Sequence, residues 1–242
     1  MPFGVDEAGK GPALGSMFAA AVYCPDPDNL PAGIADSKRL APERREELAA
    51  AIRDDDRLRV GVAEVPTRRI DDPETDMNSL AVAAHAEAID AALAGLEGES
   101  NDDLENPVSG LCDACDTDAE RFARRVHDAC SIGAASTPDA TADSLEIDLD
   151  LEARHGADDE SPIVGAASIV AKVERDAHVE SLSAAYDAYE TVGSGYPSDP
   201  NTQAFLEAYV DDHGELPVCA RESWSTCEKL LAEAEQTGLG EF

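Results

Sequence analysis

The chain has 242 residues, which suits one domain with a full core, alone or with a small appendage. Hydrophobic residues make up 43% of it, which excludes a disordered acidic tail. The 52 acidic and 18 basic residues give a formal net charge of -34, a self-repulsion that molar salt would screen. Composition therefore favours a protein of a salty cytoplasm, with an ordinary acidic protein as the alternative.

The sequence also argues against export and against a membrane segment. Charge at Asp6 interrupts any secretory apolar region, and no run approaches the roughly 18 apolar residues of a membrane helix. The six cysteines, without a signal peptide, are expected to be free thiols. We therefore expect a cytoplasmic protein.

Strands and helices alternate after an opening pair of strands. Hydrophobic periodicity predicts strands at 3–8, 16–24, 58–65, 110–114 and 146–151. It predicts helices at 42–53, 78–96, 118–129, 163–189, 202–212 and 222–235. This order is typical of an α/β layer with a mixed sheet, followed by a C-terminal helical appendage.

The strongest motif is the segment at 6–12, Asp-Glu-Ala-Gly-Lys-Gly-Pro, at the end of the first predicted strand. Neighbouring strand residues point to opposite faces, so Asp6 and Glu7 can serve one site only if the chain turns right after them. Gly9 and Gly11 permit that turn and let the backbone approach a sugar or phosphate, while Lys10 offers a cation. A charged surface turn is the simpler alternative. It does not explain why one of only four lysines lies between two glycines.

A second segment, Asp36-Ser37-Lys38, lies just before the helix predicted at 42–53. A hydroxyl, backbone N–H groups and a cation near a helix start form a candidate phosphate cradle. An ordinary helix-capping region is the more frequent explanation of such a string.

Two more segments place acids beside predicted elements. Asp113 ends the strand at 110–114, and Asp118 is expected to begin the next helix as a capping acid. Cys112 and Cys115 flank Asp113, but a zinc site needs two further ligands that are not evident, which favours free thiols. Asp158 precedes the apolar helix at 163–189, where it either stabilises the helix start or faces inward to complete an acidic cluster.

The last two features carry cations and an aromatic ring. Ser168, Lys172 and Arg175 follow one another at helical spacing, so they share one face of an otherwise apolar helix. Tyr196 lies in the glycine- and proline-rich loop at 193–200, where it could stack on a base or sugar. A packed turn tyrosine is at least as common.

Taken together and in this order, the five segments resemble ribonuclease HII, particularly its archaeal branch. The resemblance runs from Phe3 to about Trp224 and is interrupted by polar stretches at 97–109 and 134–145. It implies a ribonuclease H-like mixed five-stranded sheet flanked by helices at 1–190, with a C-terminal loop and helical appendage at 191–242.

The resemblance also implies the site residues. The family's catalytic, metal-binding carboxylates match Asp6, Glu7, Asp113 and Asp158. The motif that lines the ribonucleotide 2′-hydroxyl matches Gly9, Lys10 and Gly11, and the tyrosine that senses the junction matches Tyr196. Phosphate contacts match Asp36, Ser37 and Lys38, and the helix near the nucleic-acid backbone matches Ser168, Lys172 and Arg175. Many members have Arg where this chain has Lys10, which leaves the contact of that side chain open.

By resemblance, the reaction is two-metal hydrolysis of a phosphodiester bond. Carboxylate oxygens select Mn²⁺ or Mg²⁺, and two ions about 3.5–4 Å apart would activate water and stabilise the departing 3′ oxygen. The implied substrate is an RNA–DNA hybrid, or duplex DNA containing ribonucleotides, cut on the 5′ side to leave 3′-hydroxyl and 5′-phosphate ends. The 2′-hydroxyl must be what separates RNA from DNA. We expect the enzyme to act as a monomer.

The charge of -34 is at odds with binding a polyanion, above all at high salt. A basic track of Lys10, Lys38, Arg39, Lys172 and Arg175 on the acidic body would resolve this. We therefore expect that replacing Lys38 or Lys172 with Ala weakens substrate binding.

Two other interpretations remain at this point. Ribonuclease HIII shares the core motifs, but it normally carries an N-terminal substrate-binding domain, for which a catalytic strand starting at residue 3 leaves no room. A non-catalytic protein that binds nucleic acid or cations is the second. Position separates them: catalytic acids must converge, whereas acids of a solvated surface point apart.

Overall fold

The computed structural model of the chain describes residues 1–34, 40–96, 107–132 and 147–239, with the backbone alone at 235–239. These residues form two compact units, each built from several stretches of chain. The first holds Met1–Ala8, Phe18–Glu64 and Asn78–Val173, and the second holds Gly9–Met17, Val65–Met77 and Glu174–Phe242. The units are interleaved in sequence, while the boundary that we expect after residue 190 stays a prediction.

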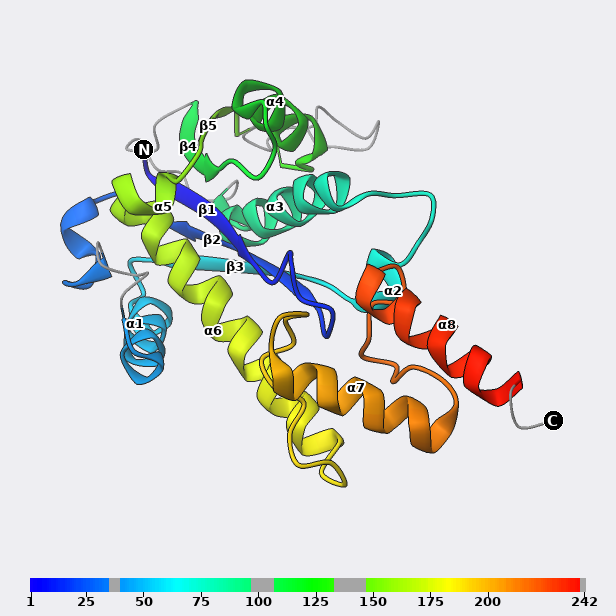
Figure 1. The fold of residues 1–242 in the computed structure, drawn as a ribbon. Coiled ribbons are helices and arrows are strands. Elements are labelled where there is room, and N and C mark those ends of the chain that lie inside the picture. The colour runs from blue at the N-terminus through cyan, green and yellow to red at the C-terminus, as the bar shows by residue number, and fades with distance from the viewer. Residues whose placement is uncertain (35–39, 97–106, 133–146, 240–242) are drawn as a thin grey trace. The chain divides into compact units, whose positions relative to one another are not determined.

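In the first unit, the described residues form a mixed five-stranded sheet with the order β3-β2-β1-β4-β5 (Figure 1). The strands are β1 (Phe3–Ala8), β2 (Met17–Tyr23), β3 (Arg59–Val65), β4 (Val108–Asp113) and β5 (Leu149–Arg154). β1 pairs antiparallel with β2 and parallel with β4, and β4 pairs parallel with β5. The predicted mixed sheet and its opening antiparallel pair are thus confirmed. β5 begins at Leu149 and not at residue 146, because its register pairs Leu149 with Val108.

The helices follow the predicted order, with short additions. They are η1 (Pro27–Asn29), α1 (Pro42–Asp54), α2 (Thr67–Ile70), α3 (Met77–Leu93), α4 (Ala119–Ala129), α5 (Ala157–Glu160), α6 (Pro162–Ala185), α7 (Pro200–His213) and α8 (Ser225–Leu239). Sequence periodicity missed η1, α2 and α5, because three or four residues are too few to show a helical period.

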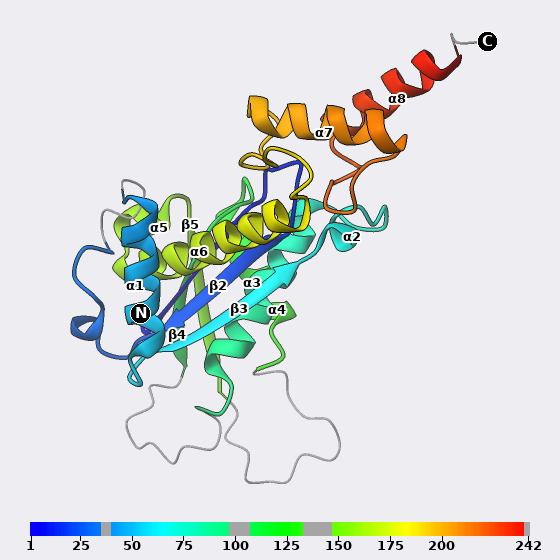
Figure 2. The same cartoon turned by 90° about the horizontal axis from the view of Figure 1, so that it is seen from below.

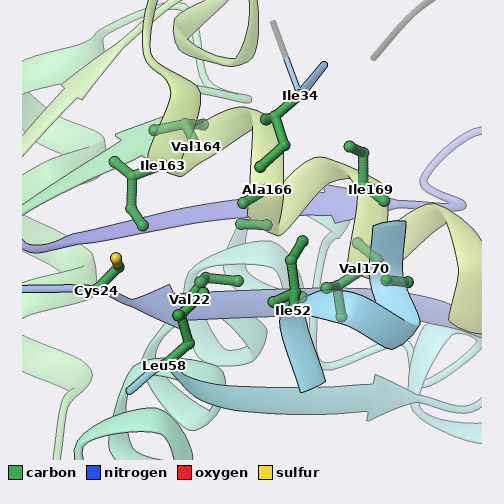
Figure 3. Close-up of a cluster of buried hydrophobic side chains, with 14 of the residues drawn as sticks. Val22, Cys24, Ile34, Ile52, Leu58, Ile163, Val164, Ala166, Ile169 and Val170 are labelled. Atoms are coloured by element: carbon green, nitrogen blue, oxygen red, sulfur yellow. The ribbon is translucent and has the colours of Figure 1, made fainter. Parts of the chain in front are cut away.

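One face of the sheet is covered by α1 and by the part of α6 that belongs to the first unit. Val22 of β2, Ile52 of α1 and Val170 of α6 meet in one buried apolar cluster (Figure 3). Gly4 of β1 allows the close approach of α6, since a Cβ there would lie 2.6 Å from the backbone of Ile163 and Val164. This contact sets α6 directly against the strand that carries Asp6 and Glu7.

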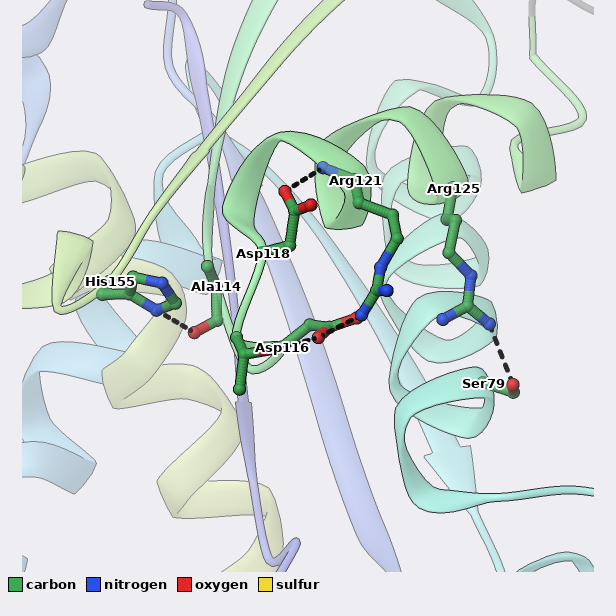
Figure 4. A network of polar contacts seen from close by, with 8 residues as sticks. Ser79, Ala114, Asp116, Asp118, Arg121, Arg125 and His155 are labelled. Carbon is green, nitrogen blue, oxygen red and sulfur yellow. Dashed lines mark hydrogen bonds and ion pairs between the residues drawn. The ribbon is translucent and has the colours of Figure 1, made fainter.

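α3 and α4 pack together in the same unit (Figure 2). The turn between β4 and α4 is fixed by two acids (Figure 4). Asp118 caps α4 by accepting the Arg121 N–H at 2.9 Å, which confirms the predicted helix start. Asp116 is buried and accepts from the Arg121 guanidinium with both oxygens at 2.7 Å. The ion pair between Asp116 and Arg121 fixes the conformation of the segment that follows Asp113.

In the second unit, α7 is capped at both ends, by Asp199 before it and by Gly214 in the left-handed conformation after it. α6 ends at Ala185, earlier than predicted, because Tyr186 and Tyr189 turn to pack edge-on against Phe205 of α7. α8 begins at Ser225 and not at 222, because the residues just before it bind the loop at 9–15. The predicted C-terminal helices are present.

Candidate active site

Asp6 lies near the end of β1, on the face covered by α6, and only 5% of it is exposed. Its carboxyl accepts a hydrogen bond from the Ser168 hydroxyl of α6 and another from the Glu7 N–H at 2.8 Å. Ser168 in turn accepts from the Lys172 ammonium at 2.7 Å. Two of the three residues of the predicted polar stripe on α6 are thus linked to the first acid.

Asp6 is held in an environment that opposes its ionisation. Burial raises the pKa of Asp6 well above its ordinary value, and the charges of Glu7 and Asp113 raise it further. The hydrogen bond from Ser168 and the one from the Glu7 N–H act in the opposite direction. The carboxylates of Glu7 and Asp113 thus both lie close enough to Asp6 to oppose its ionisation.

Glu7 points to the other face of β1, as strand geometry requires, because the strand continues through Ala8 and turns only at Gly9. There Glu7 Oε2 lies 2.8 Å from Nε2 of His85 in α3. His85 is completely buried, packs edge-on against Phe122, and its Nδ1 has no hydrogen-bond partner among the described residues. As a carboxylate, Glu7 can only accept, so the proton sits on Nε2.

Asp113 ends β4, which runs parallel to β1 and next to it. Its Oδ1 accepts the Ala157 N–H at the start of α5 at 2.7 Å. The next residue, Asp158, is 5% exposed, whereas Asp159 and Glu160 are exposed. Asp158 therefore faces inward, while its place in an acidic cluster stays a prediction. Acids of a merely solvated surface would not be buried in this way.

The four predicted carboxylates (Asp6, Glu7, Asp113 and Asp158, together called the acidic cluster) are donors of the type that suits a hard divalent cation. Because Glu7 points to the other face of β1, the convergence of all four on one metal site stays a prediction. Carboxylate oxygens are the ligands that Mg²⁺ and Mn²⁺ prefer, and a bound cation would relieve the repulsion that Asp6 experiences. In the described part of the chain, no three His, Cys, Asp or Glu side chains are already arranged as a metal-ligand set. Neighbouring Cys112 is a free thiol whose pKa is raised by burial. It is therefore no ready thiolate ligand.

A second group of predicted residues lies in the second unit, around the loop that follows β1. Gly9 adopts a left-handed φ of 89°, the turn that the sequence predicts. The guanidinium of Arg221 donates to the carbonyls of Gly9, Lys10 and Gly15 at 2.6, 3.1 and 2.9 Å. The Trp224 indole N–H donates to the Gly11 carbonyl at 3.1 Å. Neither Arg221 nor Trp224 was predicted to belong to the site; the available signal was the only tryptophan of the chain, in Arg-Glu-Ser-Trp.

Tyr196 borders this loop, since a Cβ on Gly11 would lie 3.6 Å from its Cε1 atom, and 42% of the tyrosine is exposed. The Arg175 guanidinium lies 5.2 Å from the centre of the Tyr196 ring and donates to the Ser194 carbonyl. With 11% of its side chain exposed, Arg175 contacts the tyrosine loop, whereas we expected it to face nucleic acid. Its expected role stays a prediction.

The predicted site residues thus fall into two groups. Asp6, Glu7, Asp113, Asp158, Ser168 and Lys172 belong to the first unit, and Gly9, Lys10, Gly11, Arg175 and Tyr196 belong to the second. Asp36, Ser37 and Lys38, and with them Arg39 of the expected basic track, lie outside the described residues. No helix in the described ranges has the length and apolar character to cross a membrane.

The topology of the sheet, with acids near the carboxyl ends of β1 and β4, defines a ribonuclease H-like protein. The crystal structure of ribonuclease H2 from Pyrococcus horikoshii OT3 matches it with a TM-score of 0.77 at 30% identity, covering 97% of this chain and 98% of that one.

The sequence comparisons define the family. The family model of ribonuclease HII matches residues 3–227. A ribonuclease HII of Halobacterium salinarum is 53% identical over 240 residues, 99% of either chain. Another, of Haloarcula marismortui, is 53% identical over 242 residues, 100% of either chain. The chain belongs to the ribonuclease HII family and is a ribonuclease H, a hydrolase, as its motifs predicted.

Proposed function

We propose that the protein cuts the RNA strand of RNA–DNA hybrids and duplex DNA on the 5′ side of an embedded ribonucleotide. Water would form a new bond to phosphorus while the bond from phosphorus to the preceding 3′ oxygen breaks. The products are a 3′-hydroxyl end and a 5′-phosphate end. The observation that carries this proposal is the buried carboxyl of Asp6, whose ionisation the nearby charges of Glu7 and Asp113 oppose.

The acidic cluster would hold two Mn²⁺ or Mg²⁺ ions through Asp6, Glu7, Asp113 and Asp158. When bound, such ions activate water and stabilise charge on the departing oxygen. Ser168 would orient Asp6, and Lys172 would hold the Ser168 hydroxyl so that its proton points to the carboxylate. His85 would orient Glu7 by donating from Nε2. Asp6 and Glu7 would thereby be oriented by partners from two different helices.

The loop at Gly9–Gly11 would read the ribose, with Tyr196 stacking beside it. Gly9 follows Glu7 by two residues, so recognition and hydrolysis are carried by one short stretch of chain. The few cations of the expected basic track, Lys38 and Lys172 among them, would offset the net charge of -34 toward the phosphates. The same charge, and the haloarchaeal relatives, favour a halophilic cytoplasmic enzyme that acts as a monomer.

The test is cleavage of a DNA duplex that bears one ribonucleotide, with Mn²⁺ or Mg²⁺, across a KCl series. We expect one cut, 5′ to the ribonucleotide, and none in the same duplex made of DNA alone. Asp6→Asn should be inactive, and the exposed Asp54→Asn should match the wild type. A wild type without cleavage at any salt concentration, or an Asp6→Asn variant as active as the wild type, contradicts the proposal. Binding that is unchanged in Lys172→Ala across that series would remove this lysine from the basic track.

A further inference from the structure

We propose that Arg221 and Trp224 form a clamp that fixes the turn at Gly9–Gly11 and thereby sets the preference for ribose over deoxyribose. This inference rests on the proposed function, because it concerns how the same loop selects its substrate. Neither residue belongs to the motifs that the sequence analysis assigned to substrate. Both act from more than 200 positions away, with separations of 212 and 213 residues from Gly9 and Gly11.

Arg221 is completely buried, and it is the largest fully buried side chain among the described residues. Its guanidinium donates to three backbone carbonyls of one loop, and its carbon Cζ lies 4.8 Å from the centre of the Trp224 ring. Burial lowers the pKa of Arg221 to about 10, so it stays charged at neutral pH. A buried cation with such partners holds the loop more firmly than neutral hydrogen bonds would.

The backbone around the clamp is anchored on both sides. The Arg221 N–H donates to the Ala13 carbonyl at 2.8 Å, and the Gly15 N–H donates to the Cys219 carbonyl at 2.8 Å. The Gly195 carbonyl accepts from the N–H of Ala13, also at 2.8 Å. Arg221 and the loop therefore cannot shift independently of each other.

The clamp determines the direction in which the polar groups of the turn point. In a planar trans peptide, the N–H points opposite to the preceding carbonyl. Because the carbonyls of Gly9 and Lys10 point to Arg221, the N–H groups of Lys10 and Gly11 point to the other side. The Gly11 carbonyl points to Trp224, and Pro12 after it has no N–H. Two successive donors so aligned suit a hydroxyl or phosphate oxygen.

A fixed pair of N–H donors distinguishes ribose from deoxyribose, because deoxyribose lacks the 2′-oxygen and leaves the donors without their acceptor. A turn that is free to rearrange would find other partners and would lose part of this discrimination. We therefore expect loss of the clamp to change the ratio of affinities for the two sugars more than it changes binding to the phosphate backbone.

The experiment measures binding by fluorescence anisotropy, with Ca²⁺ in place of Mn²⁺. The probes are a DNA duplex with one ribonucleotide and the same duplex made only of DNA. The readout is the dissociation constant for the all-DNA duplex divided by that for the duplex with one ribonucleotide. It is measured in the wild type and in Arg221→Met, Arg221→Lys and Trp224→Phe. Arg68→Met is the matched control, because it removes one exposed positive charge from the same unit. A smaller folded fraction weakens both affinities equally and leaves the ratio unchanged.

We expect Arg221→Met to lower the ratio about tenfold, and Arg221→Lys to recover part of it by keeping one charged donor. Trp224→Phe keeps the ring over Arg221 but removes the donor to Gly11, and we expect a loss of about threefold. Arg68→Met should keep the wild-type ratio. If Arg221→Met does not fold, the ratio measured for Trp224→Phe tests the inference by itself.

The inference is overturned if the wild type prefers the ribonucleotide while Arg221→Met, or failing that Trp224→Phe, keeps the full ratio. An equal loss in Arg68→Met also overturns it, since charge alone would then be responsible. A wild type that neither cleaves nor prefers the ribonucleotide is a different outcome, which removes the proposed function itself.

Discussion

The two units each bury an ionisable group, and they differ in the partners that they give it. In the first, Asp6 is surrounded by groups that raise its pKa, because burial and the charges of Glu7 and Asp113 all disfavour its ionised form. In the second, Arg221 is satisfied by three carbonyls and covered by an indole ring. Burial disfavours the charged form of both groups, but Asp6 also faces the like charges of two carboxylates, whereas Arg221 is bound to three carbonyls.

The difference separates a site prepared for a ligand from a site that holds the backbone. The ionised form of Asp6 would be stabilised most by a bound metal cation. Until such a cation binds, the buried carboxylate destabilises the folded state. Arg221 needs no further partner, so its contacts contribute to folding and to the shape of the loop. The following variants break or sharpen this comparison.

The largest effect is expected for Asp6→Asn. If the carboxylate holds a metal ion worth about 4 kcal/mol to the transition state, its loss should lower the cleavage rate by roughly 10³-fold. The same change removes a charge that burial disfavours, so the free energy of unfolding without divalent ions should rise. Single-turnover cleavage and urea denaturation measure the two quantities. A variant that is inactive but also less stable than the wild type would contradict the inference that the charge of Asp6 destabilises the folded state.

Arg221→Met should have the opposite effect on stability. It leaves three loop carbonyls without their donor, and we expect the free energy of unfolding to fall by about 3 kcal/mol. Urea denaturation in molar KCl is the measurement, with exposed Arg68→Met expected to stay close to the wild type. Equal stability of the two variants would show that Arg221 does not hold the loop.

Ser168→Ala tests the hydrogen bonds that offset the repulsion at Asp6. Without the hydroxyl, Asp6 loses a donor and Lys172 loses its acceptor, so we expect Mn²⁺ to bind about tenfold more weakly. Isothermal titration with Mn²⁺ measures this affinity. Ser181→Ala is the control on the same helix, because that exposed hydroxyl donates only to the His178 carbonyl. If both variants bind Mn²⁺ like the wild type, Ser168 does not position Asp6.

The smallest effect is a dependence on pH. Asp6 has a folded pKa above its unfolded value, so the folded state favours the protonated acid, and this contribution is lost as the pH rises through the folded pKa. The stability advantage of Asp6→Asn should therefore be smallest below about pH 4 and should grow as the pH rises. Thermal unfolding in chelator across this range measures it. An advantage that shrinks with rising pH would reverse the sign of our argument.

Much of the fold and of the acidic cluster could be predicted from local sequence. The opening strands, the long helices and the cap at Asp118 follow from periodicity and capping, which act within a few residues. Asp6, Glu7 and Asp113 stand at strand ends that sequence could locate. By contrast, the late start of α8 depends on where the residues before it bind, which no local pattern encodes.

The partners of the charged groups were decided only by the tertiary structure. The sequence determined that acids follow an apolar strand and that a lysine lies between two glycines in the next turn. It did not determine that His85 lies 2.8 Å from Glu7 or that Arg221 binds the turn, because these contacts join residues 78 and 212 positions apart. A buried histidine or arginine has no sequence signature of its own. Its role depends on which carboxylate or carbonyls the folded chain brings to it, since only a desolvated partner makes such a contact strong.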